Sequence, residues 1–236
     1  MACTAGGRFN TARARAAQEI LREMVILEDL YNGPRLVAGL DASYTRGSLG
    51  IGVSVLIDLD GMKTIDCVSY VREVCIPYIP GLLAYREMAV MAPALNTLIE
   101  RGYRIDMVVV DGHGIAHPRG FGIASHVGVA FNIPSIGVAK KRLYGEVRRI
   151  GGREYIVDGE RVLGGVVDRV YVSPGHMVSV DSAIRIIEGL RLYGRLPEPT
   201  RIADAVTKEV KRSGRLSPGF HECPAKARSA SLLNYI

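Results

Sequence analysis

No stretch of this 236-residue chain is long and apolar enough to resemble a transmembrane span. The N-terminus also lacks the apolar core and the small-residue cleavage site of a secretory signal, although arginines among alanines give it a faint likeness to a transit peptide. Internal repeats and low-complexity tracts are absent as well. The length fits one domain over residues 1–236, and we expect no membrane partner.

Cysteine is scarce, with four residues in the whole chain. Cys3, Cys67, Cys75 and Cys223 form no CxxC pair and no Cys/His spacing typical of zinc sites. Cys67 and Cys75 lie in a strand-like region, where we expect small core residues. A chain without a visible disulfide framework belongs by default in a reducing compartment, so we expect a cytoplasmic location.

Basic residues outnumber acidic ones by 30 to 24, which gives a formal charge of +6 and a pI of about 9.2. This balance suits a polyanionic partner such as nucleic acid. Many basic proteins bind no nucleic acid, so the charge raises that expectation only modestly.

Hydrophobic periodicity predicts the order of elements along the chain. Helices are expected at residues 11–31, 82–101, 124–132, 182–193 and 202–212. Strands are expected at residues 36–40, 50–59, 63–74, 106–110 and 135–139, with further hairpins within residues 142–172. The first helix, within an N-terminal segment 1–35, depends on the helical spacing of Ile20, Met24, Leu27 and Tyr31.

Three breaks in this pattern carry their own predictions. Pro93 falls inside the second helix and should kink it or split it in two. Residues 196–200 are expected to be extended. The tail over residues 213–236 is basic, contains prolines and is expected to be peripheral.

The predicted order is an antiparallel meander continued by parallel strands through helical crossovers. This order gives an α/β fold with a mixed β-sheet flanked by helices. It matches a ribonuclease H-like core. A Rossmann fold is disfavoured, because no GxGxxG motif follows the first strand.

The most informative segment runs from Met107 to Gly120, where a short apolar run meets a glycine-rich loop. The run ends at Asp111, which is where open α/β sheets place their ligands, just outside the carboxyl end of a strand. Taken alone, Asp111 is explained equally well as the cap of an ordinary strand-to-helix turn.

Asp41 ends the first strand, which can lie beside the strand over residues 106–110 in a sheet of this order. Asp41 and Asp111 would then project from one sheet edge and share a cation, although Asp41 alone reads as a turn residue. Carboxylates without Cys or clustered His favour Mg²⁺ or Mn²⁺ over zinc. In phosphodiester cleavage such an ion orients a water and stabilises the leaving oxygen.

Two further acids are candidates for the same chemistry. Glu87 has Leu83 and Met91 at i−4 and i+4, so it falls on an apolar helix face, either paired in the core or held for a purpose. Asp204 lies near a helix start, where the macrodipole alone would favour an acid.

Three other side chains have both a functional and an ordinary interpretation. Tyr78 lies between two prolines that keep the backbone extended, so it can wedge against a base or pack on its own loop. Lys140 follows an apolar strand and can meet phosphate or belong to a solvated basic run. His176 can be catalytic, but a lone His in a turn is usually structural.

Five ordered motifs resemble the endonuclease V family, the deoxyinosine-directed repair nucleases, over residues 37–208. The motifs are Val37-Ala-Gly-Leu-Asp-Ala-Ser-Tyr44, Pro77-Tyr-Ile-Pro-Gly-Leu-Leu-Ala-Tyr-Arg-Glu87, Val110-Asp-Gly-His-Gly-Ile-Ala-His-Pro-Arg-Gly120, Gly137-Val-Ala-Lys-Lys141 and Arg195-Leu-Pro-Glu-Pro-Thr-Arg-Ile-Ala-Asp204. The resemblance implies a ribonuclease H-like fold and Mg²⁺-dependent hydrolysis of the second phosphodiester bond 3′ to deoxyinosine, leaving 3′-OH and 5′-phosphate. Mn²⁺ would be able to substitute for Mg²⁺.

The resemblance also implies roles for single residues. Asp41 and Asp111 match the metal-binding acids, and Glu87 matches a third active-site carboxylate that binds metal. Asp204 matches a fourth position that varies between His and Asp. The residues that would contact DNA are Tyr78 as the wedge that fills the space of a displaced base, Pro80 beside it, and His117 and Lys140 near the cleaved strand.

A hypoxanthine pocket is implied at Gly81, Leu83, Gly114, Ile123 and Leu143. Backbone amides can receive O6, while a tight wall excludes the exocyclic amine of guanine. His113 departs from the family pattern as we expect it, with a smaller or amide side chain in many relatives. The resemblance assigns no role to the chain after Arg212.

Two rival functions belong to different classes. One is a ribonuclease H-like metal nuclease acting on inosine-containing RNA or on DNA junctions. The other is a non-catalytic nucleic-acid-binding module, which four spaced carboxylates disfavour, since phosphate binding gains nothing from them. We expect a monomer that acts on deoxyinosine-containing DNA.

Overall fold

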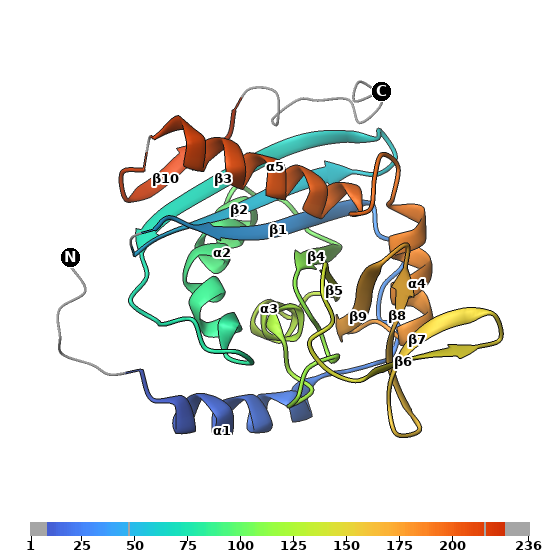
Figure 1. Ribbon diagram of the computed structural model, residues 1–236. Helices are drawn as coiled ribbons and strands as arrows, with labels where there is room; N and C mark the ends of the chain where they lie inside the picture. The colour runs from blue at the N-terminus through green and yellow to red at the C-terminus, as the bar shows by residue number, and fades with distance from the viewer. Residues whose placement is uncertain (1–8, 47, 215, 225–236) are drawn as a thin grey trace.

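A computed structural model of the chain describes residues 9–46, 48–214 and 216–224, and its main feature is one mixed sheet (Figure 1). Its strands are β1 (Leu36–Tyr44), β2 (Leu49–Asp58), β3 (Lys63–Glu73), β4 (Met107–Asp111), β5 (Ser135–Ala139), β6 (Glu146–Ile150), β7 (Arg153–Asp158), β8 (Arg161–Val167), β9 (Val170–His176) and β10 (Gly219–Glu222). Their order in the sheet is β10-β3-β2-β1-β4-β5-β9-β8-β7-β6. The predicted meander is β1–β3, and β4 and β5 continue it in parallel.

Helices cover both faces of this sheet. They are α1 (Thr11–Leu21), α2 (Leu83–Glu100), α3 (Ile123–Phe131), α4 (Val180–Gly189) and α5 (Glu198–Ser213), with a 3-10 turn, η1 (Arg22–Met24), after α1. Residues Ala38 and Leu40 of β1 pack with α2 and α3, whereas Val37 packs with α4. Figure 1 shows α5 lying across β1–β3. The predicted ribonuclease H-like α/β fold is confirmed.

Close backbone contact brings α5 against the centre of the sheet. A Cβ on Gly39 of β1 would lie 2.1 Å from the carbonyl oxygen of Pro199, so only glycine allows this approach. The helix itself begins at Glu198, where we expected extended chain over residues 196–200. That prediction was wrong because proline is tolerated in the first turn of a helix, where its missing N–H has no intrahelical acceptor.

Of the two outcomes predicted for Pro93, a split of α2 is excluded, because the helix continues from Leu83 to Glu100. The prediction for the first helix needs correction. The N-terminal helix ends at Leu21 and not at residue 31, and Ile20 and Met24 are 70% and 55% exposed. The chain after η1 is extended because it hydrogen-bonds elsewhere: the Ile26 amide donates to Nδ1 of His176, and the Ile26 carbonyl accepts from Met177. His176 is therefore structural.

The cysteines among the described residues are disulfide-bonded, which corrects the expectation drawn from their spacing. Cys67 is buried as expected but forms a disulfide with Cys223, 156 residues further along the chain. Cys75 is also disulfide-bonded, and it is exposed and not a core residue. The argument for a reducing compartment therefore does not hold.

The start of the C-terminal tail is part of the sheet. Residues 219–222 form β10 on the edge of β3, and Cys223 anchors that strand to Cys67. This strand lies at the outer edge of the sheet, and residues 225–236 lie outside the described part of the chain, so the peripheral tail stays a prediction. No helix among the described residues combines the length and the apolar character needed to cross a membrane.

Candidate active site

The central strands bring the two predicted acids together. β1 and β4 pair in parallel, and their last pair is Leu40 with Val110. Asp41 and Asp111 are the next residue on each strand. Side chains alternate between faces along a strand, so both carboxylates face the same side as Gly39 and Val109, which is the side covered by α5.

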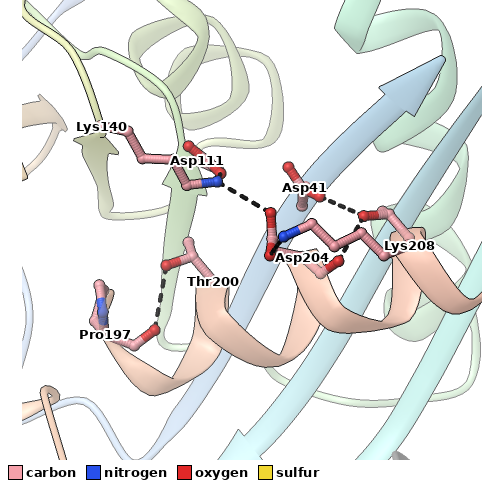
Figure 2. A network of polar contacts seen from close by, with 8 residues as sticks. Asp41, Asp111, Lys140, Pro197, Thr200, Asp204 and Lys208 are labelled. Carbon is pink, nitrogen blue, oxygen red and sulfur yellow. Dashed lines mark hydrogen bonds and ion pairs between the residues drawn. The ribbon is translucent and has the colours of Figure 1, made fainter. Parts of the chain in front are cut away.

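The third acid of the cluster comes from α5. Asp204 offers a carboxylate oxygen that, with one oxygen each from Asp41 and Asp111, forms a group within 4.8 Å (Figure 2). Glu87, on α2, is not part of this group, although the sequence placed it among the metal ligands and left Asp204 out of that set. The cluster therefore draws its acids from two neighbouring strands and one helix.

Hydrogen bonds and ion pairs fix the orientation of each carboxylate. Nζ of Lys140 lies 2.7 Å from Asp111 and 3.0 Å from Asp204, so one ammonium bridges two acids. Lys208, one turn beyond Asp204 on α5, pairs with its other oxygen. The Thr207 hydroxyl lies 2.6 Å from Asp41 Oδ2 and 3.0 Å from the Asp204 carbonyl; its single hydrogen can serve only one of them.

Burial and mutual repulsion change the proton affinity of the acids. Burial, and then the charge of Asp111, raises the pKa of Asp41 to about 7. The pKa of Glu87 is raised well above its usual range by burial and by the charges of Asp41 and Asp111. Burial also opposes ionisation of Asp204, but Lys208 and Lys140 outweigh it and lower that pKa. The site holds more buried acid than its two lysines neutralise.

A divalent cation fits this excess of acid. Asp41, Asp111 and Asp204 present hard oxygen ligands, and no Cys or His of the described residues belongs to the group. Such a ligand set is typical of Mg²⁺ or Mn²⁺ and not of zinc. Glu87 lies close enough for its pKa to respond to both strand acids, so it can hold or position a ligand at the same centre.

A cavity of about 550 Å³ opens beside the acids. Its lining includes all the residues that the sequence assigned to the site except one: Asp41, Tyr78, Pro80, Gly81, Leu83, Glu87, Asp111, His117, Ile123, Lys140, Leu143 and Asp204. Gly114 is the exception. A Cβ on Gly114 would lie 2.0 Å from the carbonyl oxygen of Pro174, so this glycine packs against β9 behind the cavity wall. Gly112 and Gly122 line the cavity in its place.

Tyr78 stands at the mouth of this cavity and is 69% exposed. The turn that follows it is closed by the Leu82 amide, which donates to the Ile79 carbonyl at 2.9 Å. Pro80 and Gly81 occupy the centre of that turn, and Gly81 has φ of +75°, as a type II turn requires. The sequence Pro-Tyr-Ile-Pro-Gly thus presents an aromatic ring on a stiff loop.

Two histidines near the cavity contact protein groups. His117 is buried, and its two ring nitrogens contact the Gly81 carbonyl and the Arg119 amide. Nε2 of His113 contacts the Lys141 carbonyl, not the acid cluster. Burial lowers the pKa of each imidazole to about 4, so both rings are neutral at pH 7.

Sequence reasoning missed Thr207 and Lys208, which hold Asp41 and Asp204. Their spacing was a usable signal, since residues three and four positions beyond Asp204 share its helix face. Arg119 stands in the quoted HPRG motif but received no role, and nothing in the sequence points to Gln18, which contacts it.

A ribonuclease H-like sheet that carries a carboxylate cluster at the ends of two central strands defines a metal-dependent nuclease. The family model of endonuclease V matches residues 19–205, and a curated relative, endonuclease V of Aeropyrum pernix, is 52% identical over 209 residues, covering 86% of this chain and 81% of that protein. The chain belongs to the endonuclease V family and is a deoxyribonuclease.

Solved structures of family members have the same fold. Endonuclease V from Streptomyces avermitilis superposes with a TM-score of 0.80 at 33% identity, covering 89% of this chain and 96% of that one. A variant of Ciona intestinalis endonuclease V, at 25% identity and a TM-score of 0.68, covers 86% of this chain and 97% of its own. That protein is in complex with a 23mer DNA containing an inosine followed by a ribo-adenosine.

Proposed function

We propose that this enzyme is a Mg²⁺-dependent repair endonuclease that hydrolyses the second phosphodiester bond 3′ to deoxyinosine in DNA, leaving 3′-OH and 5′-phosphate. The observation that carries the proposal is the position of the Asp41–Asp111–Asp204 cluster in one cavity with an exposed aromatic ring, Tyr78. The inosine-containing DNA bound by the Ciona intestinalis relative supports the choice of substrate.

Asp41, Asp111 and Asp204 would hold the metal, with Glu87 as a further ligand or as a base for water. When bound, the metal lowers the pKa of water and stabilises charge on the leaving oxygen. Lys140 offsets negative charge on the phosphate that is cut. Because Lys140 pairs with Asp111 and Asp204, its ammonium would lie beside the bound metal and the phosphate.

Access to one nucleotide requires that its base leave the stack. Tyr78 and Pro80 would occupy the space that the base leaves, and His117 supports this loop from the protein side. The displaced hypoxanthine would enter the cavity between Gly81, Leu83, Ile123 and Leu143. Gly114 contributes indirectly, by letting its loop pack closely against β9.

The substrate range, the metal and the assembly state complete the proposal. We take Mg²⁺ as the natural ion, with Mn²⁺ able to substitute, and a monomer as the working form. A cytoplasmic location stays a prediction. Cleavage of inosine-containing RNA or of DNA junctions is the alternative activity, and binding without catalysis is the alternative class.

The test is cleavage of four end-labelled substrates in Mg²⁺: a duplex with one deoxyinosine, the same duplex with deoxyadenosine, a four-way junction and the matched inosine RNA. The proposal expects a single cut at the second bond 3′ to deoxyinosine, and at least about a hundredfold slower cutting of the others, as base recognition provides. Equal cutting of the deoxyadenosine duplex, or faster cutting of the RNA or junction, would contradict it.

A further inference from the structure

The loop that presents Tyr78 is held from behind at Gly81. The Gly81 carbonyl accepts two hydrogen bonds, one from Nε2 of His117 at 3.0 Å and one from Nη2 of Arg119. A side chain at Gly81 would meet the guanidinium, since its Cβ would lie 2.9 Å from Nη2. The carbonyl at the end of the turn therefore has a fixed direction.

Arg119 is oriented in turn by a residue of the N-terminal helix. Nε of Arg119 donates to Oε1 of Gln18 at 2.6 Å, and Nε2 of Gln18 donates to the Phe121 carbonyl at 3.1 Å. Gln18 is fully buried. A guanidinium can only donate and a carbonyl can only accept, so the amide of Gln18 has one satisfied orientation.

The same chain of contacts fixes the proton on His117. The Arg119 amide donates to Nδ1 of His117 at 3.2 Å, so Nδ1 is the acceptor. Nε2 then carries the hydrogen and donates to Gly81. The backbone amide of Arg119 thus fixes the tautomer of His117, and the guanidinium of Arg119 is the second donor on the Gly81 carbonyl.

The other end of the loop has its own anchor on α2. Nη1 of Arg86 donates to the Ile76 carbonyl, and its guanidinium lies 4.0 Å from the centre of the Tyr44 ring. Residues 76–81 are therefore held at both ends. Arg86 holds the first residue of the loop, Ile76, and the contacts of Gln18 and Arg119 hold its last residue.

We propose that Gln18 and Arg119 are positioning residues that hold the Tyr78 loop in the conformation needed to displace the base. Helix α1 takes part because it carries Gln18. The proposal rests on the proposed function, because it assigns a support to the residue that would open the duplex. Neither residue lines the cavity of the acids, so neither acts on the reacting bond.

The contacts that run from Gln18 through Arg119 to the Gly81 carbonyl are called the relay below. Two substitutions break it in different ways. Gln18→Leu has a similar volume but leaves Nε of Arg119 without its acceptor. Arg119→Lys keeps the charge, but an ammonium on a single stem cannot bridge Gln18 and Gly81 as the guanidinium fork does. The matched control is Tyr85→Phe. It removes a different hydrogen bond between α1 and α2, the one that the Tyr85 hydroxyl donates to the Ala14 carbonyl at 2.7 Å, and leaves the relay intact.

The first measurement is hydrogen exchange of the free protein over residues 76–85. Loss of one buried hydrogen bond speeds local opening roughly tenfold, so Gln18→Leu and Arg119→Lys should accelerate exchange of the Leu82 amide, and Tyr85→Phe should not. Thermal unfolding of each variant confirms that it is folded. Unchanged exchange in both relay variants overturns the proposal.

The second measurement is fluorescence of 2-aminopurine placed beside deoxyinosine in a duplex, without metal, which reports unstacking and not cleavage. Both relay variants should lose most of the wild-type rise, and Tyr85→Phe should keep it. Faster exchange with wild-type unstacking also overturns the proposal. If the wild-type protein does not unstack deoxyinosine, the proposed function fails, and hydrogen exchange still decides whether the relay holds the loop.

Discussion

Asp41 and Asp111 stand at equivalent positions, each one residue beyond the last pair, Leu40 and Val110, of two parallel neighbouring strands. Their carboxylates meet because the register of β1 on β4 fixes both residues on the face covered by α5. A slip of one residue would turn one acid to the opposite face. The site is thus a consequence of strand pairing in the centre of the sheet.

Without metal, Asp41 should make stability depend on pH. Its pKa of about 7 in the folded protein lies above the usual 3.8, so the native state holds this proton more tightly than the unfolded chain. The stability that protonation of Asp41 adds to the folded state is fully present below pH 4 and is lost as the pH rises through 7. Asp41→Asn should therefore gain stability over wild type across that range, on the order of 4 kcal/mol at pH 8.

Thermal unfolding in EDTA at pH 4 and pH 8 measures this difference. Glu160→Gln, which removes an exposed acid from the turn between β7 and β8, is the control and should track wild type. If the difference in stability between Asp41→Asn and wild type were the same at pH 4 and pH 8, Asp41 would ionise normally.

Lys140 should affect metal binding and catalysis in opposite directions. Its ammonium occupies oxygens of Asp111 and Asp204 that a metal needs, so Lys140→Gln should bind Mg²⁺ at least as tightly as wild type. The same change removes charge from the reacting phosphate and should lower kcat about a hundredfold. Calorimetry and single-turnover cutting separate the effects; Lys63→Gln, an exposed lysine at the start of β3, should change neither.

Gly112→Ala should narrow the cavity. A Cβ at this position would lie 2.3 Å from Cγ2 of Ile123, so this side chain, which lines the cavity, must shift. Overpacking of this kind costs about 1–3 kcal/mol, so the KM for a deoxyinosine duplex should rise roughly tenfold or more. Gly189→Ala, with no atom near its Cβ, is the control. An unchanged KM would place the base outside this cavity.

The Cys67–Cys223 disulfide should stabilise the fold without affecting catalysis. It closes a span of 156 residues and anchors β10 at the edge of the sheet, away from the central acids. The double substitution Cys67→Ala with Cys223→Ala should lower the free energy of unfolding by about 2–5 kcal/mol. Denaturant unfolding measures the loss, and cutting rates well below the melting temperature should remain those of wild type. A matching loss of activity would tie β10 to the active site.

The meander, the crossovers and the pair Asp41 and Asp111 were predictable because they depend on local periodicity and on where strands end. Asp204 was not predictable as a member of the cluster from spacing alone. Its place depends on α5 beginning at Glu198 and on the close contact between Gly39 and Pro199, both of which are tertiary features.

Long-range pairings lay beyond the sequence for the same reason. Cys67 and Cys223 are joined only because residues 219–222 pair with β3, and a four-residue strand leaves almost no periodic signal. Gln18 meets Arg119 across 101 residues, and its polar side chain on a short helix looks like an ordinary surface residue. Burial of a glutamine becomes visible only when the partners are in place.

The most direct test of the account is Mg²⁺-dependent incision of a duplex carrying one deoxyinosine by wild type and by Asp41→Asn. We predict one cut at the second bond 3′ to deoxyinosine that requires Mg²⁺, is abolished by EDTA, and is at least about a thousandfold slower in the variant although it is folded. Incision by Asp41→Asn at the wild-type rate, or wild-type cutting in EDTA, would contradict the assignment of the carboxylate cluster as the catalytic centre.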